Sequence, residues 1–237
     1  MNKLAVFVEG LTEQEFVASL VEKVGGRNRV CIEKHKASGG RRGTGRAYEL
    51  VDKSPDSDQH YFILIVDCGA DNRVVSDVRD QYHGLVASGY RSIIAVRDVY
   101  PVARDDITNL QRGLSRRLPT EPIQVVLTLA VMEVEAWFLA EHTHFQKIDP
   151  QLTLPRIVAE LGLDPSAPAP AVEDLPLPSN DLRRIYQIVG LDYHKTKTEI
   201  QRTVQSLDYG LVCLELSGRV PSIAPLIMEL DSFFSPP

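Results

Sequence analysis

The sequence predicts an α/β protein with a mainly parallel sheet flanked by helices, followed by a C-terminal helical extension. Short apolar runs alternate with helical patterns over residues 1–130, which is typical of parallel strands joined by helices. The runs are nearly continuous in apolar residues, as expected of strands covered on both faces. After residue 131 this alternation stops and helical patterns remain. We therefore predict an α/β domain over residues 1–130 and a helical extension over residues 131–237.

The predicted strands are apolar runs rich in Val, Ile and aromatic residues. The first helix follows the first strand, because Thr12 and Glu15 have the spacing of a capping box and Gly25-Gly26 ends the apolar face. Further helical patterns cover Arg73–Val86 and Asp105–Leu118. In chain order the strands are Leu4–Val8, Val30–Glu33, Tyr61–Val66, Ser92–Val96 and Ile123–Ala130.

The extension begins with a strongly apolar helical pattern over Met132–Glu141. Five prolines then fall close together, and we predict an irregular loop over residues 164–178 because proline interrupts both helices and strands. The other predicted helices of the extension are Leu154–Leu161, Asp181–Val189, Thr198–Leu207 and Ser222–Phe234.

The composition is that of an ordinary globular protein, with 43% hydrophobic and 24% charged residues in a chain of 237. No apolar run reaches the roughly 20 residues of a membrane helix, and no signal-peptide core is visible, so we expect a cytoplasmic protein that does not enter membranes. The net charge is −6, yet residues 23–46 carry eight Lys or Arg against a single Glu. The sequence leaves the oligomeric state open, and a homo-oligomer is possible.

Acidic residues follow three of the predicted strands. Glu9 follows the first, Asp67 the third and Asp98 the fourth. Because the carboxyl ends of parallel strands share one edge of the sheet, these acids are expected on one rim, where they repel unless a cation lies among them. Oxygen ligands of this kind suit Mg²⁺ or Mn²⁺. The alternative is that each acid caps a turn or helix, as Asp67 and Asp71 could do.

Two segments, VFVEGLTEQEFV and FILIVDCGAD, resemble the Toprim domain of topoisomerases, primases, small nickases and the overcoming-lysogenisation-defect nucleases. The resemblance implies a Toprim/Rossmann-like fold in which Glu9 and Asp67 hold Mg²⁺ for phosphodiester cleavage. The second aspartate of the family motif is replaced by Gly69, so that Asp71 or Asp98 is left to complete the site. The segments VMEVEAWFLAE and YHKTKTEI look like those of an uncharacterised bacterial Toprim-like branch, which implies an ATPase partner and a role in bacterial defence against foreign DNA.

Glu133 and Glu135 lie in an apolar helical pattern, where a carboxylate needs a cation, an arginine or backbone amides. We expect Glu135 to support the acidic site, and the alternative is a structural salt bridge with Arg97 or Arg104.

Two basic segments are candidates for phosphate binding. The first is a glycine-rich loop with Arg41, Arg42 and Arg46, and the second has Lys195 and Lys197 before a helix. The alternatives are a mobile solvated loop and an ordinary helix start capped by Thr196 or Thr198.

These observations predict a Mg²⁺-dependent nuclease or nickase that acts on DNA. Two other hypotheses stay open: a non-catalytic regulatory subunit of an ATPase, and a nucleotide-binding α/β protein. The predicted catalytic residues are Glu9, Asp67, Asp71, Asp98 and Glu135, and the predicted metal ligands are Glu9, Asp67 and Asp71.

Overall fold

The computed structural model describes residues 1–40, 45–55, 60–168 and 172–235. The chain divides into two compact units. The first comprises residues 1–97, 106–129 and 225–237, and the second comprises residues 98–105 and 130–224.

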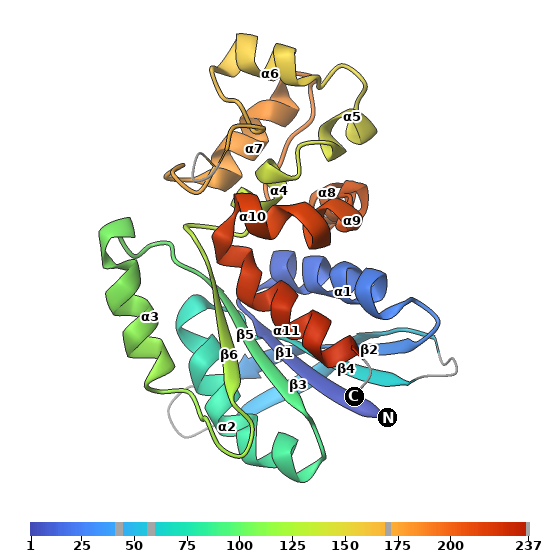
Figure 1. Cartoon of the computed structure of the whole chain (residues 1–237), viewed down its shortest axis with the longest axis vertical. Coiled ribbons are helices and arrows are strands. Elements are labelled where there is room, and N and C mark those ends of the chain that lie inside the picture. Colours follow the sequence, from blue (N-terminus) through green and yellow to red (C-terminus); the bar gives the residue numbers. More distant parts are fainter. Residues whose placement is uncertain (41–44, 56–59, 169–171, 236–237) are drawn as a thin grey trace. The chain divides into compact units, whose positions relative to one another are not determined.

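The strands form a six-stranded sheet with the order β3-β2-β4-β1-β5-β6 (Figure 1). The pairs β1–β4, β1–β5 and β2–β4 are parallel, and the pair β2–β3 is antiparallel. This mostly parallel sheet, its flanking helices and the helical C-terminal region confirm the predicted fold class. The strands are β1 (Asn2–Val8), β2 (Val30–Gly39), β3 (Arg46–Lys53), β4 (Tyr61–Asp67), β5 (Ser92–Asp98) and β6 (Val125–Ala130).

Helices cover both faces of the sheet. The crossover from β1 through α1 (Leu11–Gly25) to β2 runs in the opposite direction to that from β4 through α2 (Val74–Ala87) to β5. Right-handed crossovers therefore place α1 and α2 on opposite faces. The C-terminal helix α11 (Ala224–Phe234) lies beside α1, where a side chain at Gly25 would meet Phe234 (Figure 1).

The start of α1 differs from the predicted capping box. The helix begins at Leu11, and the side chain of Glu13 accepts a hydrogen bond from the amide of Gly10 at 2.9 Å. Thr12 lies inside the first turn and is buried. The predicted partner Glu15 instead forms an ion pair with Lys34 at 3.0 Å.

The hairpin of β2 and β3 extends the sheet beyond the prediction. β2 continues six residues past the predicted end at Glu33 and pairs with β3, which was not predicted. β3 is an edge strand with largely exposed side chains, so its sequence has none of the apolar patterning that marks a buried strand. Arg41 and Arg42 lie outside the described residues.

The second unit is mostly helical. The predicted helix over Met132–Glu141 is shorter, because Met132 has left-handed backbone with φ 61° and α4 spans Glu135–Ala140. The predicted helix Leu154–Leu161 is confirmed as α6. Of the five prolines of the predicted loop over residues 164–178, Pro165, Pro168 and Pro176 lie in irregular backbone, Pro178 begins α7, and Pro170 lies outside the described residues. The second unit also contains α5 (His144–Ile148), α7 (Pro178–Gln187), α8 (Lys197–Ser206), α9 (Tyr209–Leu211), the π-helical turn η3 (Val212–Leu216), α10 (Ser217–Arg219) and the 3₁₀ turn η4 (Pro221–Ile223).

No single helix in the described ranges is long and apolar enough to cross a membrane. One bent pair of helices, Tyr209–Arg219 with Pro221–Phe234, meets the length and composition criteria together.

Candidate functional site

Glu9 and Asp67 lie at the carboxyl ends of adjacent strands. In the parallel pair of β1 and β4, Val8 is level with Asp67, and the amide of Cys68 donates a hydrogen bond to the Val8 carbonyl at 2.9 Å. Glu9 is the next residue after Val8, and neighbouring strands lie about 4.8 Å apart. The chain leaves the two strands toward opposite faces of the sheet, an arrangement that opens a ligand crevice in α/β folds. The register therefore places both residues at the same edge of the sheet, and a metal ion shared by their carboxylates stays a prediction.

Asp67 is a buried carboxylate, with 5% of its surface exposed. Within the described part of the chain its side chain accepts one hydrogen bond, from the amide of Gly69 at 2.8 Å. Burial raises the pKa of Asp67, and this effect is only partly offset by the Gly69 amide and the charges of Lys36 and Arg46. Gly69 adopts left-handed backbone with φ 76°, which glycine tolerates best. The Gly69 amide thus holds the Asp67 side chain in place.

The other predicted metal ligand, Asp71, is engaged elsewhere. It lies in a 3₁₀ turn, η1 (Asp71–Arg73), and its carboxylate forms an ion pair with Arg97 at 3.0 Å. Within the described ranges no group of three or more His, Cys, Asp or Glu side chains is arranged to hold a metal ion. Of the three predicted metal ligands, Asp71 is therefore already paired with an arginine.

We predict that Asp67→Asn stabilises the protein at neutral pH. The folded-state pKa of Asp67 is raised, so its contribution to the free energy of unfolding is fully present below the unfolded pKa of about 3.9 and is lost as the pH rises through the folded pKa. Asn keeps an acceptor for the Gly69 amide without this cost. Thermal unfolding should show a gain of about 1 kcal/mol at pH 7 that disappears near pH 3. A gain that is equal at both pH values would contradict the assignment to ionisation.

Arg46, a predicted phosphate ligand, is bound within the first unit. Its guanidinium donates to both carboxylate oxygens of Asp77, through Nε at 3.0 Å and through Nη2. Nη2 also donates to the carbonyl of Cys68 at 2.8 Å. The hydrogen bond to Asp77 raises the pKa of Arg46. Arg46 thus connects β3 to the loop after β4 and to α2. The sequence did not indicate Asp77 as its partner, because an acid in a helical pattern usually lies in solvent.

In the second unit, Glu135 meets a lysine rather than an arginine. Its fully buried carboxylate accepts hydrogen bonds from the Tyr193 hydroxyl at 2.9 Å and from Lys195 Nζ at 3.1 Å. Lys195 also donates to Glu133 at 3.3 Å. Burial raises the pKa of Glu135, whereas the charge of Lys195 opposes that shift. Arg104, one of the alternative partners, instead pairs with Asp174 at 2.5 Å.

Strained backbone flanks this lysine–glutamate cluster, which we define as Glu133, Glu135 and Lys195. Met132 and Lys195 both have positive φ, 61° and 58°, a conformation that costs a non-glycine residue about 1 kcal/mol or more. Asp98, which ends β5, accepts a hydrogen bond from the amide of Val134 at 3.0 Å. Strain of this kind is typical of functional sites, and the sequence carried no signal of it.

Lys195→Met should destabilise the second unit. The substitution removes the ammonium group that pairs with the buried carboxylates of Glu133 and Glu135. We expect the free energy of unfolding to fall by about 2 kcal/mol. This is less than the ~3–5 kcal/mol of a fully buried pair, because 38% of the Lys195 side chain is exposed. The loss should shrink on acidification, because a protonated Glu135 no longer needs the cation. Denaturant titrations at pH 5 and pH 8 test this. Lys197→Met, at the exposed first residue of α8, is the matched control; equal effects of the two variants would refute the prediction.

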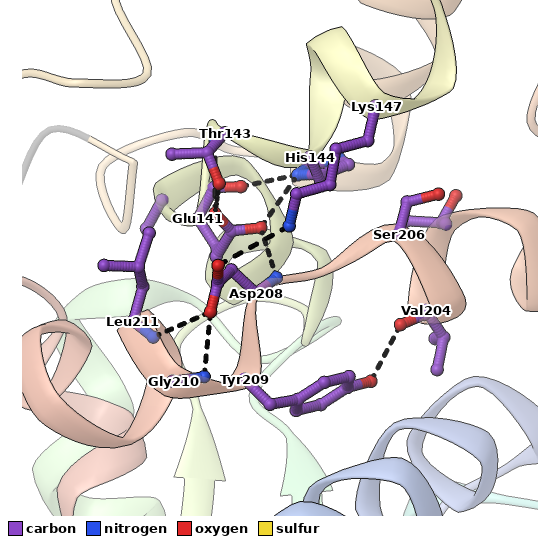
Figure 2. Close-up of polar contacts among 12 residues, drawn as sticks. Glu141, Thr143, His144, Lys147, Val204, Ser206, Asp208, Tyr209, Gly210 and Leu211 are labelled. Carbon is purple, nitrogen blue, oxygen red and sulfur yellow. Dashed lines mark hydrogen bonds and ion pairs between the residues drawn. The ribbon is translucent and has the colours of Figure 1, made fainter.

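Glu141 organises a second polar network, shown in Figure 2. Its carboxylate accepts hydrogen bonds from the amides of Thr143 at 3.2 Å and Asp208 at 3.0 Å, and His144 lies 3.5 Å away. Burial by itself raises the pKa of Glu141, but the hydrogen bonds from His144 and Thr143 lower it below the ordinary value. Both carboxylate oxygens are used by neighbouring chain segments, so the network joins the end of α4 to the start of α9.

Lys197, another of the predicted phosphate ligands, starts α8 and is exposed. The helix is capped by Thr196, whose hydroxyl accepts from the Glu199 amide in a capping box. This segment is therefore an ordinary helix start with Thr196 as its cap, which was the alternative to phosphate binding.

No family model and no curated protein matches the chain. Among solved structures, it is similar to the crystal structure of a hypothetical protein from Pyrococcus horikoshii OT3, with 16% sequence identity and a TM-score of 0.49. That similarity covers 97% of this chain and 99% of the other. The functional proposal therefore depends on the residues of this chain alone.

Proposed function

We propose that the protein is a Mg²⁺- or Mn²⁺-dependent phosphodiesterase of Toprim type that cleaves a nucleic-acid strand, with DNA as the substrate. The observation that carries the proposal is the register of β1 and β4, which sets Glu9 and Asp67 at neighbouring strand ends. An enzyme of this class needs paired carboxylates at the edge of a crevice.

The two side chains fit a hard divalent cation. Both offer carboxylate oxygens, and Mg²⁺ takes only one or two carboxylates while it keeps several waters. Asp67 is buried with a raised pKa and without an ion pair to any described residue, so a cation would lower the cost of its ionisation. Glu9 and Asp67 would hold the ion, which when bound supplies charge for the phosphoryl-transfer transition state and activates water.

The residues around the pair have supporting roles. The Gly69 amide fixes the orientation of the Asp67 carboxylate, and the Asp71–Arg97 ion pair anchors the turn that follows. Arg46, bound to the Cys68 carbonyl, holds the same loop from the side of β3. A carboxylate fixed in this way loses little conformational entropy when it binds a cation or a substrate.

The direct test is cleavage of supercoiled plasmid by the purified wild-type protein. We expect nicked circles with Mg²⁺ or Mn²⁺ and intact plasmid with EDTA. A panel of single-stranded, duplex and RNA substrates identifies the preferred strand. Intact nucleic acid across the panel at all metal concentrations would reject the proposed function.

A further inference from the structure

An open pocket lies next to Asp67 in the first unit. Its volume is about 550 Å³, and its lining includes Ser38 and Gly39 from the end of β2, Arg46 from β3, and Arg73. The three residues that follow Asp67 in the chain, 68–70, complete the loop side of the pocket. The pocket and the carboxylate of Asp67 are therefore joined by one short loop.

The lining is cationic. Its described residues include two arginines and no acidic residue. The charge of Arg46 is balanced by Asp77, whereas the guanidinium of Arg73 forms no ion pair or hydrogen bond with any described residue. An arginine is well suited to bind phosphate oxygens through two parallel hydrogen bonds. Arg73 is thus the residue of the pocket that is able to take an anion.

The backbone at this point favours the same kind of ligand. Arg73 ends the 3₁₀ turn η1, which follows the loop of the pocket and leads directly into α2. Gly39 and Gly69, on two sides of the pocket, both have positive φ and present backbone without side chains. A phosphate group can approach such backbone closely.

We infer that this pocket is a phosphate subsite, in which Arg73 binds a phosphodiester group of the strand to be cleaved. The inference rests on the proposed function, because it assigns the pocket to the substrate of Glu9 and Asp67. Among the residues of the lining that the structure describes, none has an aromatic side chain that could stack on a base. The contact therefore positions the strand without reading its sequence.

The test is binding of a labelled oligonucleotide, measured by fluorescence anisotropy in EDTA at several salt concentrations. Arg73→Gln should weaken binding roughly tenfold at low salt, equally for different sequences, and lower the slope of log Kd against log salt by about one. Arg73→Lys should keep most of the slope. Arg79→Gln, which removes an exposed arginine of α2 outside the pocket, is the matched control and should bind like the wild type. Wild-type binding by Arg73→Gln would overturn the inference.

Two further arms separate the sources of phosphate and the two proposals. A mononucleotide or inorganic phosphate that binds through Arg73 more tightly than the oligonucleotide would overturn the assignment to a strand. Binding that depends on Arg73 in a protein that cleaves nothing would support the subsite and reject the proposed function. Cleavage by the wild type with unchanged substrate affinity in Arg73→Gln would reject the subsite alone.

Discussion

Glu9→Gln is expected to abolish metal-dependent cleavage while the protein stays folded. The substitution keeps the size of the side chain and removes its charge, so the pair with Asp67 loses half of its negative charge at the sheet edge. Loss of one essential group of this kind lowers kcat by roughly 10²–10³-fold or more. Plasmid nicking at saturating Mg²⁺ measures the effect, and circular dichroism checks the fold.

The matched control is Glu49→Gln, which removes an exposed glutamate of β3 in the same unit. It should cleave like the wild type. Equal nicking by wild type and Glu9→Gln would remove Glu9 from the reaction and trace the cleavage to another group or to a contaminant.

Arg46→Met should give the largest loss of stability among the variants considered. It leaves the carboxylate of Asp77, of which 1% is exposed, without its cation. Breaking a buried ion pair from one side costs about 3–5 kcal/mol, because the remaining charge stays buried and unpaired. Urea denaturation of the variant should therefore show a midpoint far below that of the wild type.

A double-mutant cycle isolates the interaction. Asp77→Leu combined with Arg46→Met removes both charges, and the pair of substitutions should recover most of the lost stability. Additive losses in the double variant would contradict a direct coupling. Phosphate binding should be tested at Arg73 and not at Arg46, because we expect a variant of Arg46 to disturb the fold itself.

The buried strands were predictable because burial on both faces requires continuous apolar sequence. All residues from Leu4 to Val8 are fully buried, and Ser92–Asp98 is buried throughout, so these segments have a sequence pattern that no loop shares. Because the ends of these apolar runs are clear in the sequence, Glu9 and Asp67 could be recognised as residues at strand ends.

The edge of the sheet and the polar pairs were not predictable in the same way. β3 is largely exposed and lacks the apolar pattern of a buried strand, and it pairs with the edge of β2. The contacts of Lys195 with Glu135 and of Arg46 with Asp77 join residues 60 and 31 positions apart, and no spacing rule links such positions. The position of Asp71 in the sequence suggested a metal ligand, but in the structure its carboxylate forms an ion pair with Arg97.

Calorimetric titration of the wild type with Mn²⁺ tests the joint role of Glu9 and Asp67 most directly. We predict one saturable site that is lost in both Glu9→Gln and Asp67→Asn and kept in Glu49→Gln. The bound ion should also raise the thermal stability of the wild type, by about 2.7 kcal/mol at 100 times its Kd. No saturable site, or one that survives both substitutions, would contradict a metal centre built on these two carboxylates.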